Sequence, residues 1–308
     1  MKMSLKKVIK MTALVLAGIL LLCSCSKENE IKEETESKEP EEDRKEELVK
    51  TLEFNGKQMS YIRFGNPEGK PFVILPGLSL KSVMGSAEAI AAAYDLMAKE
   101  HDVYLFDHIK EVKEGYSIEG MADDTLKAFE LLGIKNADVM GVSMGSMVAQ
   151  TMALKSPESV ASLVLCSPTS DVKNSDQTTL QTWRSLAEKE DVASLMESFG
   201  EMVYSPAFYE KYKDIIIAGG EGTSKQDLSN FIHLIDAIKE FDVHERLNEI
   251  KCPVFVLGAG EDKVLGADAA LAIAEKLQCE YYIYEGYGHG VYDEAPDYLS
   301  RIKSFLDK

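Results

Sequence analysis

The chain has 308 residues, of which 45% are hydrophobic and 8% aromatic, an ordinary composition for a globular protein of one large or two small domains. Its formal net charge is −18 at pH 7, and the sequence contains no basic stripe that could neutralise the phosphates of a nucleic acid. Nucleic acid is therefore not an expected partner, and the length leaves room for a sizeable hydrophobic core.

Residues 1–24 have the layout of a secretory signal peptide. Four lysines, the last of them Lys10, precede an uncharged apolar run over residues 11–22, which is shorter than the roughly 20 residues of a membrane-spanning helix. The sequence Leu22-Cys23-Ser24-Cys25 resembles the bacterial lipoprotein box, with an aliphatic residue three positions before Cys25 and a small residue directly before it. This resemblance implies lipidation of Cys25 and an extracytoplasmic protein anchored to a bacterial cell membrane. A plain signal peptide and an uncleaved short anchor are the alternatives.

A strongly charged segment follows the lipidation site. Positions 27–50 hold 11 acidic and 6 basic residues and almost no large apolar side chain. Such a segment cannot bury enough surface to offset the entropy that it would lose on ordering. Residues 25–49 are therefore predicted to be a disordered, self-repelling tether between the membrane and the folded part of the chain.

The folded part is predicted to begin with a β-hairpin. Residues 50–64 alternate between apolar and polar side chains around Asn55-Gly56, which is the strongest short-range hairpin signal. Short apolar runs then alternate with helical patterns, which indicates an α/β fold with a mostly parallel sheet flanked by helices. The predicted strands cover residues 72–75, 103–106, 137–142, 163–166, 254–257 and 281–284, and the predicted helices cover 87–99, 118–132, 145–155 and 267–277.

Residues 171–250 interrupt this alternation with a long helical pattern, so we predict a helical cap inserted into a core formed by 50–170 and 251–308. The cap helices are expected around residues 179–188, 192–202, 206–216 and 225–241. The insertion should lie over the carboxyl ends of the strands, where open α/β sheets place their sites. Some of its apolar side chains should then line a cavity with Leu78, Leu80 and Met144; the candidates are Trp183, Leu195, Met196, Phe199, Met202, Tyr204, Phe208 and Phe231.

A serine bracketed by glycines follows one of the predicted strands. The sequence Gly141-Val142-Ser143-Met144-Gly145 lies between that strand and a helix, which is the context of a nucleophile elbow. Glycines two positions before and after the serine let strand and helix approach closely. The G-x-S-x-G pattern alone is weak, and the alternative is a tight turn with an incidental serine. Its place between a strand and a helix makes Ser143 a candidate nucleophile.

A nucleophile elbow predicts an acid and then a histidine further along the chain. Asp262 follows the predicted strand over residues 254–257, with Glu261 and Asp268 as its rivals for the acid. His289 follows the last predicted strand and is the only one of the five histidines that comes after the acid. Both groups fall at the carboxyl ends of strands, so we expect them to meet Ser143 there.

The motifs GVSMG, LGAGEDKV and GYGHGVYDEAP around these three residues resemble those of the α/β-hydrolase superfamily, and the resemblance extends from about residue 50 to the end of the chain. It implies that Ser143 is the nucleophile, that His289 is the general base and acid, and that Asp262 orients the imidazole. It also implies an oxyanion hole made by the backbone N–H groups of Leu78 and Met144.

Two segments depart from the pattern of many relatives. Pro76-Gly77 stands where many of them have His-Gly, at the end of the strand that leads to the oxyanion hole. Asp107-His108-Ile109-Lys110-Glu111 stands where many have Arg-Gly-x-Gly-x-Ser. The shape of the anion pocket and the loop beside the site are therefore left open at this point.

These features together predict a serine hydrolase that cleaves a small carboxylic ester, or a thioester, through an acyl-enzyme. A carbon–carbon bond hydrolase with the same triad and a non-catalytic surface binding module on the same fold are the alternatives. No metal-ligand spacing and no phosphate-binding glycine loop occurs, so neither a metal nor a cofactor is expected. The expected substrate is a small molecule with an uncharged, short to medium acyl group, and the oligomeric state is left open.

Three cysteines lie in the folded part of the chain, and an odd number cannot all pair within one chain. Cys252 and Cys279 begin two predicted strands that should be neighbours, so any disulfide would join them. Free thiols at these two positions and at Cys166 are the favoured prediction, because a domain of this size does not depend on disulfides.

Overall fold

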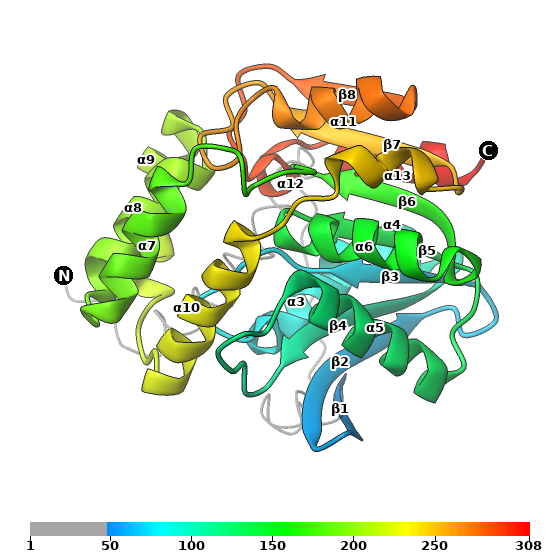
Figure 1. Cartoon of the computed structure of the whole chain (residues 1–308), viewed down its shortest axis with the longest axis horizontal. Coiled ribbons are helices and arrows are strands. Elements are labelled where there is room, and N and C mark those ends of the chain that lie inside the picture. Colours follow the sequence, from blue (N-terminus) through cyan, green and yellow to red (C-terminus); the bar gives the residue numbers. More distant parts are fainter. Residues whose placement is uncertain (1–47) are drawn as a thin grey trace, which may run out of the picture.

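The computed structural model describes residues 48–308, which fold around one eight-stranded β-sheet (Figure 1). The strand order across the sheet is β1-β2-β4-β3-β5-β6-β7-β8. The predicted signal peptide, Cys25 and nearly all of the predicted tether lie outside the described residues. The strands are β1 (Val49–Phe54), β2 (Lys57–Gly65), β3 (Lys70–Leu75), β4 (His101–Ile109), β5 (Ala137–Val142), β6 (Val160–Cys166), β7 (Val254–Ala259) and β8 (Glu280–Tyr284).

The sheet begins with the predicted hairpin. Asn55 (φ 51°) and Gly56 (φ 72°) both adopt left-handed backbone geometry, as the tight two-residue turn between β1 and β2 requires. Strand β2 also pairs antiparallel with β4, and every pairing from β4 to β8 is parallel. The prediction of a mostly parallel sheet is confirmed.

Helices cover both faces of the sheet because its central strands are apolar on both sides. Every residue of β5 is buried, and neighbouring residues point to opposite faces, so Val139 and Met140 belong to different hydrophobic clusters. One face is covered by α5 (Ile118–Leu132), α6 (Met144–Lys155) and α11 (Ala269–Leu277), and the other by α3 (Ala87–Ala93), α4 (Asp95–Ala98), α12 (Val291–Glu294) and α13 (Tyr298–Leu306). Three short 3₁₀ helices complete the core: η2 (Val83–Ser86), η3 (Pro157–Ser159) and η4 (His244–Glu249).

The prediction of a single helix over residues 87–99 is wrong, because the chain breaks between α3 and α4 at Tyr94. There the backbone has φ −93° and ψ 16°, and the N–H of Met97 donates to the Tyr94 carbonyl at 2.9 Å, which is a tighter i→i+3 bond. The Tyr94 hydroxyl lies 3.8 Å from the sulfur of Met140 on β5. The break therefore accompanies the docking of an aromatic side chain onto the sheet, a tertiary contact that helical periodicity does not reveal.

Four helices form a separate group between β6 and β7, on the left of Figure 1 and beyond one end of the strands. The two ends of this cap are joined at its base, where Val172 N–H donates to the Phe241 carbonyl at 2.9 Å and Val243 N–H to the Ser170 carbonyl at 2.8 Å. The cap is therefore a closed insertion on the sheet. Its helices are α7 (Thr178–Glu188), α8 (Val192–Val203), α9 (Pro206–Ala218) and α10 (Lys225–Lys239).

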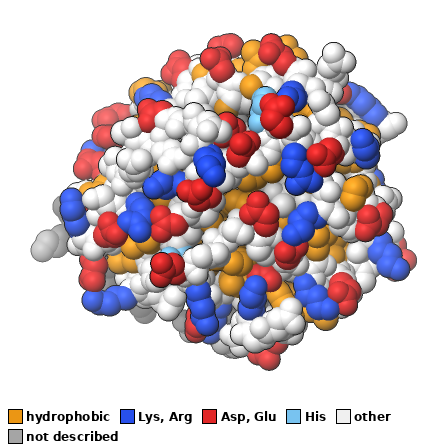
Figure 2. Space-filling view, in the orientation of Figure 1, with side chains coloured by type: hydrophobic (Ala, Val, Ile, Leu, Met, Phe, Trp, Pro, Cys, Tyr) orange, Lys and Arg blue, Asp and Glu red, His pale blue; other side chains and the backbone are white. Residues whose placement is uncertain are grey.

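The surface carries charges of both signs. On the face shown in Figure 2, acidic and basic side chains are interspersed, with apolar side chains exposed between them. Among residues 48–308, no helix is both long and apolar enough to cross a membrane.

Candidate active site

Ser143 occupies a strained turn between β5 and α6. Its backbone has φ 51° and ψ −116°, which a side-chain-bearing residue rarely adopts and which points the hydroxyl away from the sheet end. The turn is possible only with glycine on both sides: a Cβ at Gly141 would lie 2.3 Å from the Gly145 carbonyl oxygen, and a Cβ at Gly145 would lie 2.1 Å from the Leu75 carbonyl oxygen. The two glycines therefore allow strand and helix to touch and place the half-buried serine at the tip of the turn.

Ser143, His289 and Asp262 lie in one hydrogen-bonded row. The Ser143 Oγ lies 2.8 Å from His289 Nε2, and His289 Nδ1 lies 2.7 Å from Asp262 Oδ2. The carboxylate can only accept, so Nδ1 carries a proton and Nε2 is left to accept the serine proton; this tautomer is assigned from the bonding pattern. The three residues come from the ends of β5, β7 and β8, which the parallel sheet brings to one edge.

Asp262 is buried yet held as a carboxylate. Burial by itself raises its pKa, but the His289 imidazole and the backbone N–H groups of Val264 and Leu265 outweigh burial, so that the pKa lies below its ordinary value. Those N–H groups donate to Asp262 Oδ1 at 2.8 and 2.9 Å, which leaves Oδ2 for the histidine. The acid is thus ionised and fixed in orientation. Its sequence rivals Glu261 and Asp268 are both exposed.

The two expected oxyanion donors flank Ser143. Met144 is the first residue of α6, where a backbone N–H has no partner within the helix and the helix dipole favours negative charge. Leu78 follows Gly77, and a Cβ added to Gly77 would lie 3.3 Å from the Ser143 Cβ. The Pro76-Gly77 segment therefore brings the chain against the nucleophile.

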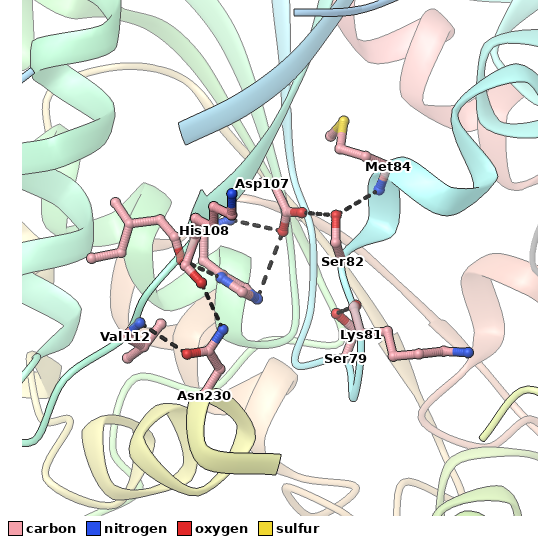
Figure 3. A network of polar contacts seen from close by, with 10 residues as sticks. Ser79, Lys81, Ser82, Met84, Asp107, His108, Val112 and Asn230 are labelled. Carbon is pink, nitrogen blue, oxygen red and sulfur yellow. Dashed lines mark hydrogen bonds and ion pairs between the residues drawn. The ribbon is translucent and has the colours of Figure 1, made fainter. Parts of the chain in front are cut away.

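The end of β4 and the residues directly after it hold the loop that follows Leu78 by a polar network (Figure 3). Asp107 accepts hydrogen bonds from the Ser82 hydroxyl and from the His108 N–H, the latter at 2.8 Å. Asn230 of α10 donates to the Lys110 carbonyl at 3.0 Å and accepts from the Val112 N–H at 2.9 Å. Residues 107–112 therefore connect the oxyanion loop to the cap, in the place where the sequence departs from many relatives.

A small cavity, partly open to solvent, lies over Ser143 between the core and the cap. Apart from Ser143 and His289 its lining is apolar, with no lysine, arginine, aspartate or glutamate among the lining residues. Such a site favours a small uncharged group beside the nucleophile. The lining residues are Gly77, Leu78, Ser143, Met147, Leu180, Trp183, Phe199, Val203, Ile238, Val264, Leu265, His289 and Tyr292.

The sequence predicted the apolar cap cavity but assigned it several residues that lie elsewhere. Trp183, Phe199 and Leu78 line the cavity, and the two aromatic rings pack 4.8 Å apart. Met144 instead lines a separate cavity beside Phe106. The remaining predicted residues do not line the cavity, because they pack the cap onto itself or onto the core: Leu80, Leu195, Met196, Met202, Tyr204, Phe208 and Phe231.

Sequence reasoning missed several residues that hold the site. Ser167, just after β6, donates its hydroxyl to the His289 carbonyl at 2.6 Å, and its positive φ of 44° marks a second tight turn. Asp293 and Glu294 bind the cap directly beyond the histidine loop. A positive φ at a serine has no sequence pattern of its own, so Ser167 could not have been found from the sequence.

Cys166, Cys252 and Cys279 are all free thiols. Strands β7 and β8 are paired as predicted, yet Cys252 and Cys279 do not bond to each other. Within residues 48–308 no cluster of three or more histidine, cysteine, aspartate or glutamate side chains could hold a metal ion.

Comparison with known proteins assigns the chain to a family. Residues 70–296 match the family model of the alpha/beta hydrolase fold, and the chain belongs to this family. It is 23% identical over 250 residues to "Putative carbamate hydrolase RutD" of Rhizobium rhizogenes, a match that covers 78% of this chain and 94% of the relative. It is also 21% identical over 152 residues to 3-oxoadipate enol-lactonase 2 of Acinetobacter baylyi, covering 48% and 55% of the two chains. The protein is accordingly a hydrolase.

Solved structures share the fold. The α/β hydrolase MGS-M2, from a Medee basin deep-sea metagenome library, superimposes with a TM-score of 0.76 at 21% identity over 84% of this chain and 98% of its own. The enol-lactonase of Burkholderia xenovorans gives a TM-score of 0.70 at 17% identity over 84% of this chain and 100% of its own. At these identities the likeness concerns the fold.

Proposed function

We propose that this protein is a serine hydrolase that cleaves a small, uncharged carboxylic ester or related acyl substrate through an acyl-enzyme at Ser143. The observation that carries the proposal is the row of hydrogen bonds from Ser143 Oγ through His289 to Asp262, at 2.8 and 2.7 Å. A serine is a weak nucleophile on its own, and a neutral imidazole within hydrogen-bond reach is what activates it.

In the first half of the reaction, His289 Nε2 takes the Ser143 proton as the oxygen attacks the acyl carbon. The resulting oxyanion accepts hydrogen bonds from the N–H groups of Leu78 and Met144, and the ionised Asp262 stabilises the imidazolium. His289 then gives its proton to the leaving oxygen, which departs as an alcohol and leaves an ester on Ser143. In the second half, water attacks that ester with His289 as base, and the acid and free serine are released.

The apolar cavity supports the choice of substrate. Its small size and its lack of acidic and basic lining residues other than the neutral His289 suit a short to medium acyl chain and disfavour an acidic one. The relatives carry names of enzymes that act on a carbamate and on an enol-lactone. Each of these substrates has an acyl carbon that a serine can attack, so both classes belong in the test panel with simple esters and carbon–carbon bond substrates.

The test is a comparison of Ser143→Ala with the matched control Ser304→Ala, which removes an exposed hydroxyl on α13. Ser143→Ala should fold as the wild type does, by circular dichroism, and lose about 10⁴-fold or more of kcat on the best substrate of the panel. The control should keep full activity. A Ser143→Ala protein with more than a tenth of normal activity would reject the nucleophile, and a wild type that binds but never turns over would favour a binding module.

We also propose that the protein is exported and anchored through Cys25, on the strength of the Leu22-Cys23-Ser24-Cys25 box and the acidic segment behind it. The folded domain would then act on substrates outside the cytoplasm, at the membrane surface. Mass spectrometry of the native N-terminus should find a diacylglyceryl cysteine at position 25. An unmodified N-terminus at any other residue would overturn this assignment.

A further inference from the structure

Both chain neighbours of His289 are glycines, and both lie against the cap. A Cβ at Gly288 would lie 2.8 Å from the carbonyl carbon of Tyr204, and a Cβ at Gly290 would lie 2.6 Å from the Tyr204 ring. The N–H of Gly290 donates to the Val203 carbonyl at 2.7 Å. The histidine loop therefore touches the junction between α8 and α9 along its backbone.

Two carboxylates extend this contact directly after the loop. The Tyr204 hydroxyl donates to Asp293 Oδ2 at 2.9 Å. Glu294 accepts two hydrogen bonds from Ser205, one from the backbone N–H to Oε1 at 2.9 Å and one from the hydroxyl to Oε2 at 2.5 Å. We call the contacts between residues 203–205 of the cap and residues 288–294 of the core the latch.

The latch is costly to build. Asp293 and Glu294 are adjacent and partly buried, and within residues 48–308 no cation forms an ion pair with either of them. The titratable groups that face the pair from α12, the cap and the α3–α4 break are Tyr292, Tyr204 and Tyr94, all of them neutral. Burying uncompensated carboxylates lowers stability, so two of them at one junction indicate a role beyond packing.

We propose, on the basis of the serine-hydrolase function proposed above, that Asp293 and Glu294 are positioning residues that hold the cap and the His289 loop together as one unit. Val203 lines the substrate cavity, and His289 must stay 2.8 Å from Ser143 to act as base. The latch therefore holds Val203 and His289 in place together. Opening of the cap therefore loosens the imidazole, so that Ser143 is activated only while the cap covers the cavity and excludes water from it.

The Glu294 carboxylate gives the latch a pH dependence. Both of its oxygens accept from Ser205, and a carboxylate accepts more strongly than a carboxylic acid, so adding a proton weakens this pair of bonds. Burial raises the pKa of Glu294 above its usual value, and the hydrogen bonds from Ser205 oppose this shift. In the wild type, kcat should therefore fall on protonation of Glu294 toward the lower kcat of Glu294→Gln, a pH-dependent loss that the Glu294 variants lack.

The test uses Glu294→Ala, Glu294→Gln and Tyr204→Phe, with Asp236→Asn as the matched control that breaks a cap-internal ion pair with Arg184. Glu294→Ala should lower kcat by at least about tenfold, since a displaced base costs about that or more. Glu294→Gln keeps one acceptor and should restore part of the rate, and its kcat should lack the loss toward acid pH that protonation of Glu294 causes in the wild type. Tyr204→Phe keeps the aromatic ring against Gly290, and its kcat should lie between those of the wild type and Glu294→Ala. The control should match the wild type.

Hydrogen exchange at the Gly290 amide provides a readout that does not depend on activity. Exchange should be at least tenfold faster in Glu294→Ala than in the wild type, because the Gly290 amide is hydrogen-bonded to Val203 only while the latch is intact. Unchanged exchange and a kcat within threefold of the wild type in Glu294→Ala and Glu294→Gln would overturn the latch while leaving the function intact. A wild type without turnover would instead reject the proposed function, and exchange at Gly290 would still decide the latch.

Discussion

The buried carboxyl of Asp293 should make the protein less stable as the pH rises. Burial raises the pKa of Asp293 from 3.8 to about 7; the hydrogen bond from Tyr204 opposes this shift and the charge of Glu294 adds to it. Between about pH 4 and 7 the folded protein therefore holds a proton that the unfolded chain has lost. The free energy of unfolding therefore falls as the pH rises through this window. Above about pH 7, Asp293 causes no further change.

The size of this loss of stability follows from the shift in the pKa of Asp293. The difference between 3.8 and about 7 is roughly three units, and at about 1.4 kcal/mol per unit it sets a ceiling of about 4 kcal/mol on the stability lost by pH 8. In Asp293→Asn the side chain is neutral at every pH and its oxygen can still accept from Tyr204. The variant should therefore be within about 1 kcal/mol of the wild type at pH 5 and clearly more stable, by up to about 4 kcal/mol, at pH 8.

Urea unfolding at pH 5, 6, 7 and 8 measures this difference. Trp183 is the single tryptophan and is buried in the cap, so its fluorescence reports unfolding, and linear extrapolation gives the free energy. The difference between variant and wild type isolates Asp293, because every other titrating group is common to both. Ser304→Ala, which removes an exposed hydroxyl and no titratable group, is the control and should match the wild type at all four pH values. A difference that is the same at pH 5 and pH 8 would refute the burial of an uncompensated carboxyl at this position.

Three further predictions concern the elbow, the cavity and the thiols. Gly145→Ala should lower the free energy of unfolding by about 3 kcal/mol or more and abolish activity, because the added Cβ would lie 2.1 Å from the Leu75 carbonyl oxygen. A variant that is folded by circular dichroism and active in ester assays would contradict this close approach. In a series of p-nitrophenyl esters, kcat/KM should rise about fourfold per methylene until the cavity is full and then fall. A flat series, or a best rate on emulsified long chains, would indicate an open groove. Thiol titration after denaturation without reductant should find Cys166, Cys252 and Cys279 free, and a single free thiol would mean a disulfide. In the native protein these thiols should react slowly, because burial raises the pKa of Cys252 and Cys279 to about 11 and that of Cys166 to about 12.

The sequence predicts those parts of the protein that depend on a local sequence pattern or on the order of residues along the chain. Asn55-Gly56 specifies the hairpin, and the glycines around Ser143 specify the elbow, because each feature is decided by the backbone freedom of a few adjacent residues. Asp262 and His289 follow from the order in which a parallel sheet brings strand ends to one edge.

The parts that the sequence does not predict depend on contacts between distant segments. Glu294 binds Ser205, 89 positions away, and Asn230 binds the Val112 N–H, 118 positions away. Neither pair belongs to a repeating pattern, since each depends on how the cap lies on the core. The same reason explains why Leu195 and Phe231, apolar and helical like the cavity residues, turned out to be buried in the packing of the cap.

The role of Ser143 as nucleophile is tested most directly by treating the intact wild-type protein with an uncharged fluorophosphonate and locating the adduct by mass spectrometry. His289 Nε2 lies 2.8 Å from the serine oxygen, so we expect one phosphonyl group per chain, on Ser143, with simultaneous loss of all hydrolysis. Ser143→Ala should take up no label, and Ser304→Ala should be labelled as the wild type is. An unlabelled wild type, or a label on any other residue that abolishes activity, would contradict the assignment of Ser143.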